Sequence, residues 1–124
     1  MTTPDERTRS LRWAHELLGA ISSDGELAAE IRERAIAASS AFPSPQTIQS
    51  LIASNAERLP IDMAIAIEAA RALLVDIEAS GFASAPMRRD ILYTLRHFPL
   101  ARAAERVSRA RFAFGIESWV GRDN

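Results

Sequence analysis

The 124-residue sequence contains no cysteine, and this absence removes several kinds of chemistry at once. Without thiols the chain has no disulfides, no thiolate metal sites and no cysteine nucleophile. All fifteen basic residues are arginine, so the lysine of a Walker-type phosphate loop or of a Schiff base is also missing. The five glycines form no glycine-rich phosphate-binding motif. Carboxylates, hydroxyls, histidine and arginine are left to carry any function.

Long apolar segments are also absent. No run of about 18 or more uninterrupted apolar residues occurs, and the N-terminal segment lacks the pattern of a cleaved secretion signal. We therefore expect a cytoplasmic protein with no membrane partner. The length and the 48% hydrophobic content fit a single domain over residues 1–124 with one shared core.

Catalytic signatures are missing from the polar residues that remain. His15 and Glu16 resemble the start of the HExxH zinc motif, but Gly19 stands where the second histidine would be. His97 is expected at a helix C-terminus, where an imidazolium is favoured by the helix dipole. Carboxylate pairs occur, but no pocket for acid–base chemistry is evident. We expect a non-enzymatic protein without metal or cofactor.

Proline and hydroxyl residues mark two of the three helix starts in the first half. Thr3 and Pro4 open a helix over about residues 4–22, and Asp24-Gly25 interrupts the pattern. A second helix, expected to include Leu27, runs to Phe42-Pro43, and Ser44-Pro45 opens a third. The expected apolar faces are Leu11, Ala14, Leu17, Leu18 and Ile21, then Leu27, Ile31, Ala35 and Ala38, then Ile48, Leu51 and Ile52.

The second half follows the same order. Pro60 opens a helix that ends at Gly81, and Ser84-Ala85-Pro86 opens the next, which Pro99 ends. A sixth helix is expected over about 100–113, and residues 111–116 fit a short strand, a docked tail or a fraying helix. The expected apolar positions are Ile61, Ile65, Ala69 and Leu73 with Ile67, Leu74 and Ile77 beside them, then Met87, Ile91, Leu92 and Leu95.

An internal repeat underlies this order. When residues 57–112 are placed on residues 1–56 without a gap, ten of the 56 positions are identical, including Leu17/Leu73, Gly25/Gly81 and Phe42/Phe98. Neither unit alone is large enough to bury its apolar faces. We therefore predict an all-α, six-helix bundle built from two pseudo-repeated three-helix units, 1–56 and 57–112, with an aromatic C-terminal tail at 113–124.

Two segments resemble a family of short, uncharacterised bacterial helical proteins. The stretch from Glu6 to Leu18, ERTRSLRWAHELL, resembles the ERTR-x-L helix with which those proteins begin. Leu95-Arg-His-Phe-Pro99 is similar to the LRHYP-like segment that ends their shared part, with Phe98 in place of tyrosine. The resemblance implies a diverged tandem of that helical unit and a bacterial origin, and it implies no activity.

Charge is distributed unevenly although the net charge is −1. Glu26, Glu30 and Glu33 have helical spacing in the expected second helix, and repeat symmetry places Asp76 and Glu78 near them. The predicted acidic face is Asp24, Glu26, Glu30, Glu33, Asp76 and Glu78. The alternative basic face, which would bind phosphates, is Arg88, Arg89, Arg96, Arg102, Arg106 and Arg109. Pairing between the two charged sets is a third interpretation.

The C-terminal segment is rich in aromatic residues. Phe112, Phe114 and Trp119 either fold back over the bundle or form a contact with a partner or a second copy.

These features favour a non-catalytic protein-binding module. The leading hypothesis is an immunity protein or antitoxin whose acidic face covers the active site of a cognate toxin, such as a nuclease with a basic cleft. The alternatives are a nucleic-acid-binding regulator that uses the arginines of residues 88–111, and a homodimeric structural subunit held by the aromatic tail.

Overall fold

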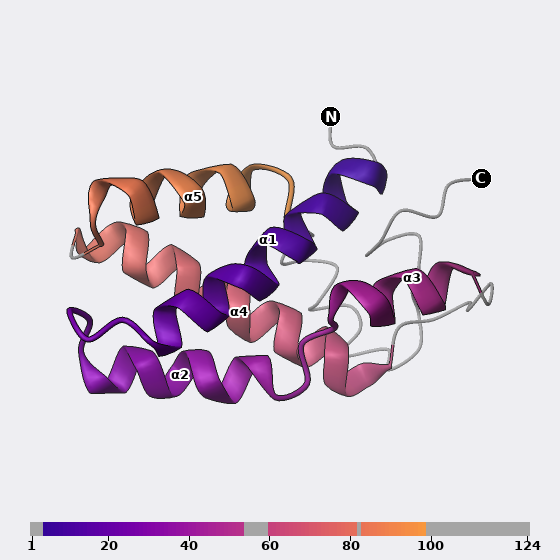
Figure 1. Ribbon diagram of the computed structural model, residues 1–124, viewed down its shortest axis with the longest axis horizontal. Helices are drawn as coiled ribbons and strands as arrows, with labels where there is room; N and C mark the ends of the chain where they lie inside the picture. The colour runs from indigo at the N-terminus through magenta and orange to yellow at the C-terminus, as the bar shows by residue number, and fades with distance from the viewer. Residues whose placement is uncertain (1–3, 54–59, 82, 99–124) are drawn as a thin grey trace.

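The computed structural model describes residues 4–53, 60–81 and 83–98, and every regular element in these ranges is an α-helix. The all-α prediction is confirmed for this part of the chain. The expected sixth helix at 100–113, the segment at 111–116 and the tail at 113–124 lie outside the described residues. The helices are α1 (Pro4–Ser22), α2 (Ala29–Ser39), α3 (Pro45–Ala53), α4 (Ile61–Ser80) and α5 (Ala85–Arg96) (Figure 1).

The helix boundaries follow the predicted capping residues. The Ser44 hydroxyl accepts a hydrogen bond from the Thr47 backbone N–H at 3.1 Å, directly before Pro45 opens α3. The Ser84 hydroxyl does the same for the Met87 N–H at 3.3 Å at the start of α5. These bonds satisfy backbone donors that have no partner within their helices.

Gly81 ends α4 in the left-handed conformation, with φ of 73°. A side chain with a Cβ is strained at such an angle, whereas glycine adopts it readily. Gly81 therefore ends α4, as predicted, because it adopts a left-handed backbone conformation that other residues disfavour.

The predicted start of α2 was too early. Asp24 forms a compact turn in which its Oδ1 accepts the Glu26 N–H at 2.9 Å and its carbonyl accepts the Leu27 N–H at 3.2 Å. Because the Asp24 carboxylate competes for backbone donors, the chain leaves the helical path here. Helix α2 begins only at Ala29, and Ala28 occupies its N-cap position without a side-chain hydrogen bond.

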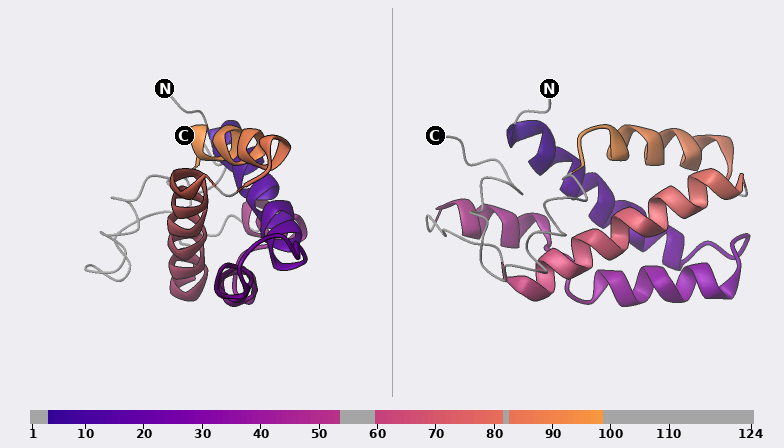
Figure 2. Two further views of the ribbon diagram at one scale, coloured as in Figure 1. Left: turned by 90° about the vertical axis from the view of Figure 1, so that its left-hand side faces the viewer. Right: turned by 180° about the vertical axis from the view of Figure 1, so that it is seen from behind.

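Helices α1 and α4 are held together through the same two neighbours. Each of them packs against both α2 and α5, and α3 packs on α1. Seen from one end, α1 and α4 lie on opposite sides, with α5 across the top and α2 at the bottom (Figure 2, left).

One continuous core fills the space between the helices. Most predicted core positions are buried, including Leu11, Leu18, Leu74 and Ile91, which are fully buried. The apolar residues of this core are Leu11, Ala14, Leu17, Leu18, Ile21, Leu27, Ala35, Ala38, Phe42, Ile48, Ala64, Ala66, Ile67, Ala70, Leu73, Leu74, Ile77, Ile91 and Phe98.

The apolar stripe expected on α4 was partly wrong. Ile61 and Ile65 are 39% and 56% exposed, whereas Ile67 is buried. Helix α4 is apolar around most of its circumference, and only the side that faces its neighbours enters the core. Spacing at four therefore could not decide which of two apolar stripes faces inward.

The first and last described helices are joined at their ends. Ser10, buried in α1, donates a hydrogen bond from its hydroxyl to the His97 carbonyl at 3.1 Å. The Glu6 Oε2 atom lies 3.2 Å from His97 Nε2. His97 therefore follows α5 as predicted, but its imidazole contacts a carboxylate of α1.

Leu18 and Leu74 give a first test of the core. Replacing either with alanine removes a fully buried side chain, and we expect a loss of about 2–5 kcal/mol in the free energy of unfolding. Urea denaturation followed by circular dichroism measures this loss. The exposed Ile36→Ala is the control and should change stability by less than about 0.5 kcal/mol. Equal losses for core and control variants would contradict this core.

The two N-cap positions of α2 and α5 allow a reciprocal test. Ala28 has extended backbone angles (φ −60°, ψ 147°) close to those of Ser84 (φ −61°, ψ 159°). We expect Ala28→Ser to stabilise the protein and Ser84→Ala to destabilise it, each by about 0.5–1 kcal/mol, because a serine hydroxyl caps the helix. Thermal unfolding of both variants measures the signs, and a loss of stability in Ala28→Ser would contradict this account.

Candidate functional site

The predicted acidic residues lie mainly around the turn between α1 and α2. Glu26 belongs to this turn and not to a helix, so the predicted helical spacing of Glu26 with Glu30 and Glu33 was wrong. Glu30 and Glu33 do lie on α2, three residues apart. All three glutamates are exposed, and within the described part of the chain none of them forms an ion pair. Asp24 is half-buried, with its carboxylate held by the turn.

Asp76 and Glu78 differ from these residues because each has a cationic partner. The Arg34 guanidinium lies 2.9 Å from Asp76 and joins α2 to α4. The Arg88 guanidinium lies 3.2 Å from Glu78 and joins α5 to α4. The predicted acidic face is therefore partly neutralised. Among the described residues, pairing between the two predicted charged sets occurs only at Arg88–Glu78, because Arg34 was not among the predicted basic residues.

The acidic residues near the turn between α1 and α2 and those near the end of α4 lie at the same end of the molecule. The turn between α1 and α2 and the end of α4 that leads into α5 lie at the same end of the long axis (Figure 1 and Figure 2, right). The sequence predicted that Asp76 and Glu78 lie near the acids of the first half, and both groups are found toward one end of the described fold.

The predicted basic residues are brought together in part. Arg88, Arg89 and Arg96 line a hollow of about 880 Å³ along α5, together with Leu92 and Tyr93. Arg89 and Arg96 form no ion pair with other described residues, whereas Arg88 contacts Glu78. The remaining predicted residues of this face, Arg102, Arg106 and Arg109, lie outside the described residues.

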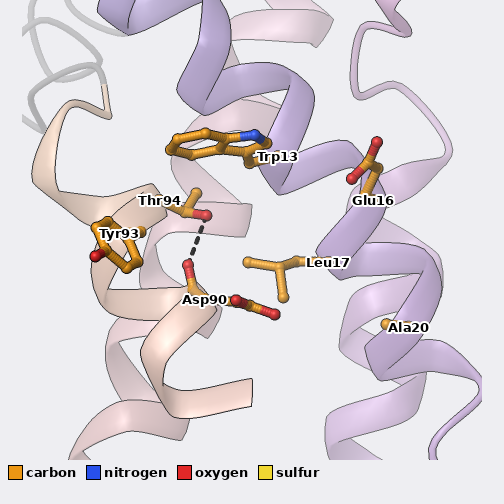
Figure 3. A pocket seen from close by; sticks show the side chains of 7 residues that line it. All are labelled: Trp13, Glu16, Leu17, Ala20, Asp90, Tyr93 and Thr94. Carbon is orange, nitrogen blue, oxygen red and sulfur yellow. Dashed lines mark hydrogen bonds between the residues drawn. The ribbon is translucent and has the colours of Figure 1, made fainter. Parts of the chain in front are cut away.

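A second hollow, between α1 and α5, was not predicted. It has a volume of about 540 Å³ and is lined by Trp13, Glu16, Leu17, Ala20, Asp90, Tyr93 and Thr94 (Figure 3). The Trp13 ring and the Asp90 carboxylate extend into the space between the helices. The Thr94 hydroxyl donates to the Asp90 carbonyl at 2.8 Å, so it is occupied within α5. Helical spacing alone hides this site because its residues come from two helices far apart in sequence.

Histidine does not form a metal site in the described ranges. His15 is half-buried on α1 and Glu16 lines the hollow beside α5. No group of three or more metal-ligating side chains occurs among the residues described. Phe112, Phe114 and Trp119, the predicted tail or dimer contact, lie outside these residues, so the homodimer hypothesis stays a prediction.

No described helix combines the length and apolar character needed to cross a lipid bilayer. Comparison of the chain with protein-family models, curated proteins and solved structures gives no match.

Proposed function

We propose that this chain is a non-catalytic protein-binding module, and specifically an immunity protein or antitoxin that covers the active site of a basic toxin. One observation carries the proposal. Glu26, Glu30 and Glu33 are exposed and have no ion-pair partner in the described fold, although nearby Asp76 and Glu78 are paired. The charge of these glutamates is available to another molecule, and a nuclease-type toxin with a basic cleft fits it.

The physical advantage of such a surface is fast and selective association. Complementary potentials steer two proteins together and raise their association rate, and like charges repel unsuitable partners. Neither effect needs a catalytic residue in this chain. The bacterial origin implied by the sequence resemblance agrees with a toxin as the partner.

Charge removal on the acidic end tests the proposal. The triple variant E26Q/E30Q/E33Q should lose the partner that the wild-type chain captures at moderate salt from its native host. We expect affinity to fall at least tenfold, or about 1.4 kcal/mol, because three complementary charges are removed. Affinity capture with mass spectrometry identifies the partner, and surface plasmon resonance measures its binding.

A control variant separates location from net charge. Q46K/Q49K/S50K changes the net charge by the same amount at exposed positions of α3. We expect it to keep the partner. If both triple variants bind the partner as the wild type does, or lose it equally, the acidic end is not the binding surface.

The hollow along α5 supports a second candidate function, binding of nucleic acid. Arg89 and Arg96 present unpaired guanidinium groups beside the exposed ring of Tyr93. Arginine neutralises phosphates and an aromatic ring stacks on bases, so this arrangement suits single-stranded nucleic acid.

Fluorescence anisotropy at low salt tests this second function. R89Q/R96Q should weaken binding to a labelled single strand and lower the salt dependence by about one unit per lost phosphate contact. The matched control is R9Q/R12Q, which removes two exposed arginines of α1. Absence of binding by the wild type at micromolar protein would exclude nucleic acid as the ligand.

We also propose that the architecture is a tandem of two three-helix units. Burial repeats with the 56-residue period, since each of the following pairs is buried at both positions: Ser10/Ala66, Leu11/Ile67, Ala14/Ala70, Leu17/Leu73, Leu18/Leu74, Ile21/Ile77, Ala35/Ile91, Ala38/Thr94 and Phe42/Phe98. The N-cap residues of α2 and α5, Ala28 and Ser84, are separated by the same period. The contact of α1 with α5 likewise has its counterpart in that of α4 with α2. The sixth helix at 100–113 belongs to this proposal as the counterpart of α3.

A further inference from the structure

Two hollows occupy matching places in the two halves of the fold. One lies between α1 and α5 and has a volume of about 540 Å³, and the other lies between α2 and α4 and has about 400 Å³. Five positions of the first correspond to positions of the second at the 56-residue offset: Trp13/Ala69, Glu16/Ala72, Asp90/Arg34, Tyr93/Ala37 and Thr94/Ala38. We call the first of these the α1/α5 groove.

Arg34, the cationic residue among those that line the hollow between α2 and α4, is paired within the fold. The guanidinium of Arg34, on α2, lies 2.9 Å from the carboxylate of Asp76, on α4. This ion pair shows that a side chain at position 34 reaches across to the neighbouring helix. The Arg34 cation is therefore balanced without any ligand by Asp76, which lies on α4 outside the residues that line the hollow.

Among the described residues, the α1/α5 groove is lined by two carboxylates and by no cationic residue. Asp90 stands at the position equivalent to Arg34, and Ala20 stands at the position equivalent to Asp76. Glu16 adds a second carboxylate on the α1 side (Figure 3). Neither Asp90 nor Glu16 forms an ion pair with any residue in the described ranges.

The same groove carries two aromatic side chains that the core does not bury. Trp13 is 36% exposed and Tyr93 is 53% exposed. The equivalent positions are Ala69 and Ala37, so a helix pair of this kind packs without aromatic residues there. Packing alone thus does not account for the two rings at the α1/α5 groove.

We propose that the α1/α5 groove binds the side chain of an arginine that belongs to a protein partner. A planar guanidinium stacks on aromatic rings while its N–H groups donate to carboxylates. Trp13 and Asp90, which extend into the space between the helices (Figure 3), offer both kinds of contact, and Tyr93 and Glu16 line the groove beside them. The groove has negative charge and no cation of its own among the described residues, so the guanidinium of a partner would supply the cation. In the other half, Arg34 supplies that cation to Asp76 from within the chain. The assignment to a partner rests on the proposed protein-binding function.

A titration of the full-length chain with N-acetyl-arginine methylamide, which mimics an arginine within a protein, tests the proposal. The NMR signal of the Trp13 indole N–H, assigned by comparison with W13F, reports occupancy of the groove. We expect a saturable shift with a dissociation constant on the order of a few millimolar for this single side chain. N-acetyl-citrulline methylamide, which replaces the guanidinium with neutral urea of similar shape, should cause no saturable shift.

Variants connect the binding to the groove. D90N should weaken binding of the arginine probe by about fivefold through loss of one charge, and Y93L by about threefold through loss of one ring. D62N removes the same charge from an exposed site on α4 and should leave binding of the arginine probe unchanged. Circular dichroism confirms that each variant folds. Equal binding of the citrulline probe, an unchanged D90N titration, or no saturation would overturn the proposal.

Two further comparisons separate this proposal from the protein-binding function. The titration needs no partner, so its failure alongside loss of partner by E26Q/E30Q/E33Q would overturn the groove assignment alone. Loss of captured partner in D90N supports the assignment. N-Propylguanidine, a free guanidinium compound with the same single charge, should bind no better than the arginine probe. The assignment to a partner would be overturned if the free guanidinium compound bound at least tenfold more tightly than the arginine probe. It would also be overturned if the arginine probe bound but the wild type captured no partner. Either result would make the groove a site for a small cation.

Discussion

The described fold depends on the burial of α1 and α4 against the same two helices. Leu18 and Leu74 are both fully buried in one continuous core, and that core requires α2 and α5 to contact both long helices. Hydrophobic burial of this kind has no preferred direction, so the charged and capping residues must fix where each helix begins and which side it presents. The hollows and the acidic end occupy the positions that this arrangement leaves at the surface.

Local chemistry made much of this fold predictable from the sequence. Ser44 with Pro45, and Ser84 with Pro86, act within one turn of chain, so their helix starts could be deduced without tertiary information. Glu26 and Ile65 were misplaced for different reasons. The turn stabilised by the Asp24 carboxylate shifts the start of α2 toward the C-terminus. Helix α4 has more apolar surface than the core can cover. The start of α2 and the exposed side of α4 both depend on which of several competing contacts forms, and the spacing of apolar residues does not reveal this.

The candidate site was less predictable because it depends on neighbours across helices. Repeat symmetry assigned Asp76 and Glu78 to the acidic face, but the cations that pair with them come from α2 and α5. The α1/α5 groove joins Trp13 to Tyr93, which lie at opposite ends of the described sequence. The 56-residue offset relates the residues of the two hollows. The offset alone does not predict a hollow, because that also requires knowing which helices pack against each other.

The hydrogen bond from Ser10 to His97 has a consequence for synthesis of the chain. It joins residues 87 positions apart, and Glu6 contacts the same histidine. During translation, the apolar side of α1 leaves the ribosome well before α5 exists to cover it. Domains whose contacts span most of the chain gain their native stability late, and exposed apolar surface in the meantime favours aggregation. Helix α2 follows α1 directly and can cover part of its apolar side early, but the part that packs against α5 stays uncovered until nearly the whole described fold has emerged.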